Sequence, residues 1–287
     1  MKKISILILS LFFTFQMAQS AVNIGSCPQK PYDVSNKFSQ VLSQISGTNF
    51  FLTKSVELVL QSQIKKEVGA KGVNVELIPY SAGDLISGKF KKVFISIPFA
   101  SKDDIAFSNF KAESSCEFSH IIANKEEIKF VQNFLMDFSL DITNDDLEKI
   151  TLSEKYKEKL EKVKVKIANF SLLKMVEPKV EIKDEKLQIS FGIETPLLFS
   201  SRVERVVISS KLKAKDGKIE LANLYVNTTK YDANMLLPII NLLNPLSFET
   251  KISNNLGIAQ IKNVDIIDDK ISLNGVIFVP KNHVIEK

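Results

Sequence analysis

The stretch VNVELIPYSAGDLISGKFKKVFISI, from Val73 to Ile97, changes the hydrophobic period of the chain from helical to alternating. Apolar side chains recur at every second position in its first part, VNVELI, and its last part, KFKKVFISI, places Phe90, Val93, Ile95 and Ile97 among lysines and Ser96. A period of two is typical of a strand that buries one face. The stretch therefore predicts two antiparallel strands, with Gly83 and Gly88 marking the bend that leads into the second strand.

The bend itself, GDLISGKF (Gly83–Phe90), is close to a phosphate-binding loop, which needs a Ser or Thr directly after its Gly-Lys pair. Phe90 occupies that position, and a strand follows where the phosphate loop requires a helix N-terminus. The segment thus argues against nucleotide hydrolysis.

Two helices are predicted before this stretch. The apolar spacing is helical from Val34 to Ile45 and again from about Thr53 to Val68. The second helix carries one apolar stripe and is closed by GAKG (Gly69–Gly72), because a glycine commonly ends a helix. The members of that stripe are Val56, Val59, Leu60, Ile64 and Val68.

Alternating segments continue after the opening stretch and predict strands at 105–112, 116–122 and 134–142. Thr143 follows as a candidate N-cap, with Asp145 and Asp146 in the first turn of a helix. Three later segments share the pattern Asp, one residue, Lys, then apolar-polar-apolar. Their aspartates, Asp184, Asp216 and Asp268, are predicted to lie at the turns of β-hairpins. The fold class is therefore α+β with an antiparallel sheet.

One apolar helix is predicted within this second half, over Asp232–Leu246, and Pro238 must kink it or start its second part. Because nearly every face of this segment is apolar, three placements stay open. It is buried in the core, it covers an apolar cavity, or it dips into a membrane surface.

The N-terminus has the pattern of a secretory signal peptide over residues 1–20: two lysines, about a dozen apolar residues, and small residues at Ala18 and Ser20. We therefore expect an exported protein of the periplasm or cell envelope. Residues 21–49 are expected to form a tether and a short helix, and residues 50–285 a single domain.

The two cysteines, Cys27 and Cys116, are expected to pair in an oxidising compartment. A competing interpretation comes from IGSC (Ile24–Cys27), which resembles a lipobox whose cysteine carries a lipid anchor. Polar residues between the apolar run and this motif make anchoring at Cys27 the less favoured alternative.

Composition and spacing give no support for catalysis, metal binding or nucleic-acid binding. The formal net charge is only +5 and the lysines are spread along the chain, so no nucleic-acid partner is expected. His120 and His283 are far apart in sequence, and the chain contains neither a paired-cysteine metal motif nor a Gly-x-Ser-x-Gly elbow. The sequence therefore predicts a protein that is not an enzyme and that has no cofactor.

The order of a helix, the Val73–Ile97 stretch, a strand and KAESSCEF (Lys111–Phe118) resembles the first half of the bacterial LmeA-like phospholipid-binding family. The segment from Lys218 to Pro280 resembles that family's closing arrangement of hairpin, helix and strands. The resemblance implies a TULIP-like (tubular lipid-binding) fold, in which a curved antiparallel sheet wraps around a long amphipathic helix. It also implies binding of phospholipid in the cell envelope, at a peripheral position on the membrane surface.

On this basis we expect a protein that holds or shuttles phospholipid, or another acyl lipid, in an apolar tunnel. For each candidate lining residue the alternative is ordinary core packing. The candidates are Phe90, Val93, Ile95, Phe107, Leu236, Ile239, Ile240 and Leu243. The candidate contacts for an anionic headgroup are Lys89, Lys91 and Lys92, and the alternative for them is an ordinary solvated strand face. The alternative function is an envelope scaffold or adaptor of the same fold with a filled interior and no ligand.

Overall fold

The computed structural model describes residues 26–27, 33–45, 47–102, 105–123, 127–158, 174–197, 200–215, 218–231 and 258–286. The predicted signal peptide, the predicted helix Asp232–Leu246 and the turn residue Asp216 lie outside these ranges. Within them the chain is an α+β protein in which every strand pairing is antiparallel, as the alternating pattern predicts.

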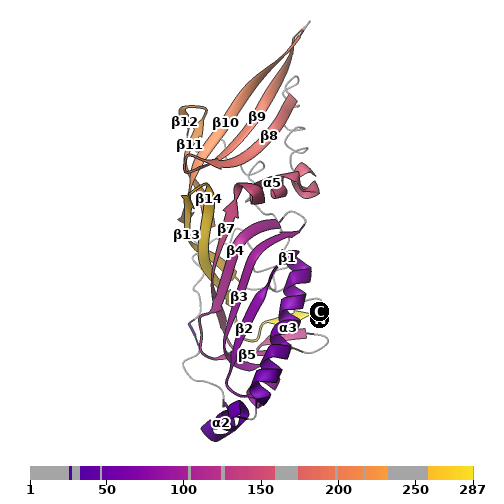
Figure 1. Ribbon diagram of the computed structural model, residues 1–287. Helices are drawn as coiled ribbons and strands as arrows, with labels where there is room; N and C mark the ends of the chain where they lie inside the picture. Colours follow the sequence, from indigo (N-terminus) through magenta and orange to yellow (C-terminus); the bar gives the residue numbers. More distant parts are fainter. Residues whose placement is uncertain are drawn as a thin grey trace.

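The larger sheet has the strand order β13-β14-β7-β4-β3-β5-β6-β15, and β1 and β2 pair with β3. Its strands are β1 (Ala70–Lys71), β2 (Asn74–Pro79), β3 (Lys89–Lys102), β4 (Ile105–Ser114), β5 (Ser119–Ala123), β6 (Glu127–Phe130), β7 (Phe134–Thr143), β13 (Ile258–Ile267), β14 (Lys270–Val279) and β15 (Val284–Glu286). The helices are α2 (Lys37–Ile45), α3 (Thr48–Val68), α4 (Ala82–Ile86) and α5 (Asn144–Leu152). Figure 1 shows α3 lying along the sheet beside β2 and β3.

A second, five-stranded sheet has the order β12-β11-β10-β9-β8 and lies end to end with the first (Figure 1). Its strands are β8 (Lys174–Lys183), β9 (Lys186–Leu197), β10 (Ser200–Lys215), β11 (Lys218–Val226) and β12 (Thr229–Tyr231). Buried side chains of both sheets belong to one hydrophobic core, and α5 packs between them.

Two-residue turns close the hairpins, as the aspartate pattern predicts. Asp184 and Glu185 both have positive φ between β8 and β9, and so do Asp268 and Asp269 between β13 and β14. Two consecutive left-handed residues match the right-handed twist of the flanking strands, and aspartate tolerates this conformation better than most residues. The third hairpin, β10–β11, pairs Lys215 with Lys218 across the predicted turn.

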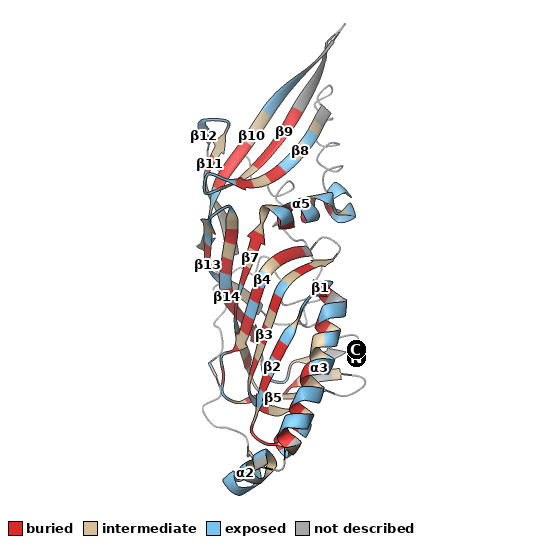
Figure 2. Cartoon of the chain, in the orientation of Figure 1, coloured by how far each residue is buried: buried red, intermediate tan, exposed pale blue. Residues whose placement is uncertain are grey.

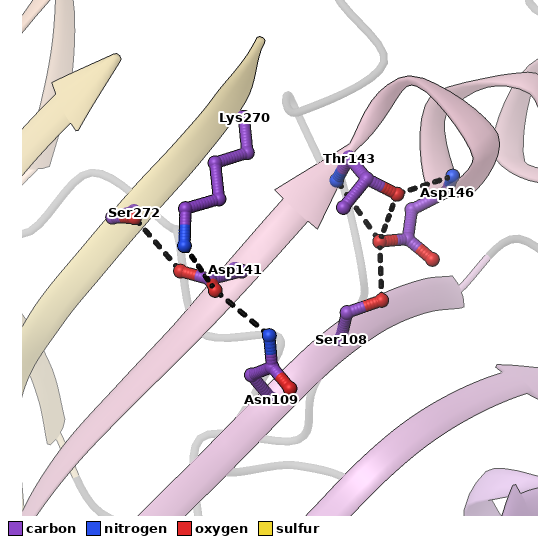
Figure 3. Close-up of polar contacts among 7 residues, drawn as sticks. All are labelled: Ser108, Asn109, Asp141, Thr143, Asp146, Lys270 and Ser272. Carbon is purple, nitrogen blue, oxygen red and sulfur yellow. Dashed lines mark hydrogen bonds and ion pairs between the residues drawn. The ribbon is translucent and has the colours of Figure 1, made fainter. Parts of the chain in front are cut away.

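Helix α5 begins with the predicted N-cap. Thr143 and Asp146 form a reciprocal capping box, and Asp146 Oδ2 also accepts a hydrogen bond from the Ser108 hydroxyl of β4 at 2.9 Å (Figure 3). The side chain of Asn144 then bonds both backbone groups of Ile182 in β8, at 2.6 and 3.1 Å. One turn of helix thereby connects the two sheets through hydrogen bonds.

A second polar group lies on the same part of the larger sheet, next to the start of α5. Asp141 of β7 accepts hydrogen bonds from Asn109 of β4 at 3.0 Å and from Lys270 and Ser272 of β14 at 2.9 and 2.7 Å (Figure 3). This carboxylate therefore links three adjacent strands across the sheet.

The predicted bend at GDLISGKF differs from the structure in one respect. Ala82–Ile86 form the short helix α4, capped by the Ser81 hydroxyl, so Gly83 lies within a helix and does not mark a bend. Gly88 is the residue that needs to be glycine. Its φ is +78°, and a Cβ there would lie 2.0 Å from the carbonyl oxygen of Ile121.

Candidate functional site

An apolar cavity of about 810 Å³ lies between α3 and the larger sheet, within the described residues. Its walls come from α3, β2, α4, β3, β5 and β7, so residues from Ser55 to Met136 converge on one space. The lining residues are Ser55, Val56, Val59, Leu60, Ile64, Val75, Leu77, Leu85, Ile86, Ser87, Gly88, Lys89, Phe90, Val93, Ile95, His120, Ile121, Ile122, Phe134 and Met136.

The floor of the cavity is the buried face of the sheet. Phe90, Val93 and Ile95 of β3 and Val75 and Leu77 of β2 are all less than a tenth exposed. The step from Phe90 to Val93 breaks strict alternation, because the pairing register of β3 against β2 shifts at this point. The extra residue is a β-bulge, which returns Phe90 to the same face as Val93.

The roof of the cavity is one side of α3. Val56 and Leu60 are half-buried over the cavity, whereas Ile64 and Val68 in the last turns are fully buried. The predicted apolar stripe of this helix therefore packs tightly onto the sheet only at its C-terminal end. Toward its N-terminal end the stripe lines open space.

A polar stripe of α3 holds the helix against the edge of β2. Glu57 Oε1 accepts a hydrogen bond from Leu77 N at 2.8 Å, and Gln61 Nε2 donates to Val75 O at 3.4 Å. Residues four apart on a helix lie on one face, and residues two apart on a strand present backbone groups to the same side. Glu57 and Gln61 thus take the place of a neighbouring strand along β2, and the apolar side of α3 is left facing the cavity.

The opening of the cavity carries exposed apolar side chains. Val59 of α3, Ile86 of α4 and Ile122 of β5 all line the cavity, and they are 53%, 76% and 44% exposed. Large apolar groups at this exposure are unusual in a cluster, and such clusters mark interaction sites. Apolar side chains therefore extend from the interior of the cavity to its opening.

A few polar groups lie at one end of the cavity. Lys89 Nζ donates to the carbonyl oxygen of Asp33 at 2.7 Å, and the Ser87 hydroxyl donates to Gly83 O at 3.0 Å. Burial, and next the charge of Lys89, lower the pKa of His120 below its ordinary value of 6.5. His120 is consequently neutral at physiological pH, and Lys89 is the cationic group among the lining residues.

The segment before α2 crosses this end of the domain. Ser35 donates hydrogen bonds to the carboxylate of Asp84 from both its backbone N–H and its hydroxyl. Burial would raise the pKa of Asp84, but the hydrogen bonds from Ser35 and Ser81 outweigh it and lower that pKa below 3.8. Asp84 therefore stays ionised and fixes the chain at Ser35.

Cys27 and Cys116 form a disulfide, so neither of these two described cysteines is a free thiol. Asn133 Nδ2 donates to the carbonyl oxygen of Ser26, beside this bond, at 3.2 Å. The disulfide occupies the sulfur that a lipid anchor at Cys27 would need, and disulfides persist in oxidising compartments. The residues predicted as a tether are thus attached covalently to the end of β4.

The sequence-predicted lining residues divide into three groups. Phe90, Val93 and Ile95 line the cavity. Phe107 lies outside it, buried in the core with its ring 5.9 Å from that of Phe110. The remaining four predicted residues, Leu236, Ile239, Ile240 and Leu243, lie outside the described residues.

The three predicted headgroup lysines are not brought together. Lys89 lines the cavity, whereas Lys91 lies over the ring of Tyr80 at 5.3 Å and Lys92 forms an ion pair with Glu113. Lys91 and Lys92 border a separate, smaller hollow of about 250 Å³. The bulge in β3 separates Lys91 and Lys92 from Lys89.

Sequence reasoning missed the contributions of α3, β2, α4, β5 and β7 to the cavity. The apolar stripe of α3 was itself a usable signal, because the apolar face of a helix next to predicted strands is expected to pack against the sheet. Its members at the cavity are Val56, Val59, Leu60 and Ile64. The contributions of Leu85 and Ile122 had no such signal, since each belongs to an element of five residues.

The arrangement suits the binding of an apolar chain. Within the described residues, no cluster of three or more His, Cys, Asp or Glu side chains could hold a metal ion. None of the helices in that part of the chain is both long and apolar enough to cross a bilayer. Comparison with family models, with curated proteins and with solved structures finds no match for this chain.

Proposed function

We propose that this protein is an exported, non-enzymatic lipid-binding protein that holds the acyl chain of a phospholipid, or of another lipid, in the cavity under α3. The proposal includes the TULIP-like arrangement that the LmeA-like resemblance implies, in which the larger sheet curves around the helix. The observation that carries it is the apolar cavity of about 810 Å³ with an apolar opening.

The size and lining of the cavity support a lipid ligand. Small-molecule sites in proteins usually have volumes of about 300–1,000 Å³ and are mostly apolar, with a few polar groups that set orientation. Transfer of one methylene group from water into such a site is worth about 0.8 kcal/mol, so a chain of about sixteen carbons gains on the order of 10 kcal/mol before binding costs. The alternative function, a scaffold, expects a filled interior, and the cavity favours the lipid-binding proposal.

Lys89 is the proposed contact for the polar end of the ligand. It is the cation among the lining residues, and it lies near the buried carboxylate of Asp84 and the neutral ring of His120. An anionic end group, a carboxylate or a phosphate, complements this charge. Lys91 and Lys92 are no longer part of the proposed headgroup contact, because they border a different hollow.

The first test is extraction of the purified, disulfide-bonded chain with organic solvent, followed by mass spectrometry. We expect co-purifying phospholipid or fatty acid. Repeated preparations without lipid, which also fail to take up an added fatty acid, would contradict the proposal.

A matched pair of tryptophan variants tests where the ligand lies. The chain has no Trp, so an introduced one is the only indole that reports. Val59→Trp places it at the cavity, whereas Leu58→Trp places it on the neighbouring position, which does not line the cavity. A fatty acid below its aggregation concentration should shift the emission of Val59→Trp to shorter wavelength and leave Leu58→Trp unchanged.

The headgroup contact has its own control. Lys89→Gln should weaken binding of a fatty acid more than binding of the corresponding uncharged alcohol, whereas Lys91→Gln should affect neither. Equal behaviour of the two variants would remove Lys89 from the proposal and leave the cavity assignment in place.

A further inference from the structure

The outward face of α3 is apolar and basic. Its exposed large side chains are Phe50, Phe51, Leu58 and Val59, which are 62%, 73%, 63% and 53% exposed. The outward face of a helix on a globular protein normally carries polar residues. Figure 2 shows this side of α3 as largely exposed, so α3 presents apolar groups to the solvent as well as to the cavity.

The neighbouring helices carry further exposed apolar side chains. Phe38 on α2 and Ile86 on α4 are each 76% exposed, and α3 contacts both helices. We call Phe38, Phe50, Phe51, Leu58, Val59 and Ile86 the apolar collar. Two of its members, Val59 and Ile86, also line the cavity, so the collar is continuous with the cavity opening.

The exposed charges that the structure describes on these three helices have one sign. Every charged side chain that the structure shows exposed on α2, α3 and α4 is a lysine: Lys37, Lys54, Lys65 and Lys66. The acidic residues Glu57 and Asp84 of these helices are buried and accept hydrogen bonds within the protein. The exposed charges described on these three helices are therefore cationic. One exposed carboxylate of the adjoining β2, Glu76, interacts electrostatically with Lys54.

Exposed phenylalanine and leucine beside lysine is the composition of helices that lie in a membrane interface. The apolar side chains enter the boundary between headgroups and acyl chains, and each lysine near an anionic surface adds attraction that salt weakens. A partner protein with a specific epitope would not require the opening of a lipid-sized cavity within the same surface.

We infer that the apolar collar docks the protein on a bilayer that carries anionic headgroups, with the cavity opening turned toward the lipid. Docking depends on the collar and the lysines beside it and does not depend on what the cavity holds. Its purpose, the passage of an acyl chain between bilayer and cavity without exposure to water, rests on the proposed function.

The test is sedimentation of the full, disulfide-bonded chain with vesicles. We expect binding to vesicles of phosphatidylcholine mixed with phosphatidylglycerol, and weaker binding to phosphatidylcholine alone. The triple variant Phe50→Ser, Phe51→Ser, Leu58→Ser should bind the anionic vesicles roughly tenfold or more weakly, because none of the three lines the cavity but all belong to the collar.

The matched control is Leu152→Ser, Val203→Ser, Ile267→Ser, which removes three side chains that are similarly exposed but lie on α5, β10 and β13. This control should bind like the unchanged protein. A second variant, Lys37→Gln, Lys65→Gln, Lys66→Gln, should lose most of the preference for anionic vesicles and most of the salt dependence.

Two outcomes overturn the inference: an unchanged protein that does not bind anionic vesicles, or collar variants that bind as well as the control. Uptake of a fatty acid separates the docking inference from the proposed function. If the collar variant still takes up a monomeric fatty acid, as reported by the indole emission in the Val59→Trp background, the cavity is intact and only docking has been lost. If vesicles bind and no fatty acid is taken up, the docking inference stands and the proposed function fails.

Discussion

The Oε1 atom of Glu57 accepts a hydrogen bond of 2.8 Å from the backbone N–H of Leu77, although Glu57 lies in the middle of α3 and is only 3% exposed. The other carboxylate oxygen pairs with Lys54 Nζ at 2.7 Å. Because both oxygens of this buried carboxylate are bonded, the contact fixes the position of α3 along β2. This contact decides which side of α3 faces the cavity.

Replacement of Glu57 should therefore be costly. Glu57→Leu leaves the Leu77 N–H buried without an acceptor, and we expect a loss of about 1–3 kcal/mol in the free energy of unfolding. Glu57→Gln keeps an acceptor and should lose less. Urea unfolding followed by circular dichroism measures both, with the exposed Ser62→Ala on the same helix as the control. Equal losses in the Leu and Gln variants would mean that the hydrogen bond to Leu77 is not the stabilising contact.

Gly88 and Gly83 should respond in opposite ways to substitution by alanine. Gly88→Ala introduces a Cβ 2.0 Å from Ile121 O at a backbone with positive φ, so β3 and β5 must separate. We expect a loss of at least about 1–2 kcal/mol for the left-handed backbone alone. Gly83→Ala meets no atom closer than 3.9 Å within α4 and should be neutral or stabilising by up to about 1 kcal/mol. Thermal unfolding of the two variants gives the comparison, and similar melting temperatures would refute it.

Asp141 should contribute stability that acid removes. Burial would raise the pKa of Asp141, but hydrogen bonds from Asn109, Lys270 and Ser272 outweigh it and hold the pKa below 3.8. A lowered folded-state pKa stabilises the protein above the unfolded-state pKa, and the stabilisation disappears as the pH falls through the folded-state value. Asp141→Asn should thus destabilise the protein at neutral pH, and the difference should shrink below pH 3.8.

Urea midpoints measured across that pH range check the Asp141 prediction. The control is Asp265→Asn on β13. It removes an exposed carboxylate that does not accept the hydrogen bonds of Asn109, Lys270 and Ser272. A difference for Asp141→Asn that is constant with pH would contradict the linkage.

The disulfide should stabilise the domain by limiting the unfolded chain. Cys27 and Cys116 are separated by 89 positions, and the chain-entropy model gives about 4–5 kcal/mol for a closed loop of that length. The double variant Cys27→Ser, Cys116→Ser should unfold at correspondingly lower urea concentration. Addition of a thiol reductant should lower the stability of the unchanged protein to that of the double variant and have no effect on the variant itself.

The features that sequence predicted well are those that depend on neighbouring residues. The hairpin turns at Asp184 and Asp268 and the capping box of Thr143 and Asp146 each arise within four positions of the chain, where residue type largely determines the backbone. The strand segments followed from alternation for the same reason. The lining residues Phe90, Val93 and Ile95 were identified from that alternation.

The features that sequence did not predict depend on distant contacts. The predicted second helix begins near Thr53, whereas α3 begins at Thr48, directly after Gly47, which adopts a left-handed conformation. Burial of Glu57 follows from the open edge of β2, about twenty positions away. The sequence made no prediction of burial for Phe50 and Phe51, which are exposed. The side of α3 on which they lie is decided by the attachment of Glu57 to β2.

The order of the strands in the larger sheet has a consequence for how the chain is made. β7 (Phe134–Thr143) pairs on one side with β4 and on the other with β14 (Lys270–Val279), so Thr143 meets Lys270. Until residue 279 has been synthesised, β7 keeps an open edge, and the whole five-stranded sheet is made in the interval. Pairing over such a separation is slow, and an open central strand invites association with other chains. The emerging chain therefore has a defined interval in which a chaperone that covers β7 would have the largest effect on yield.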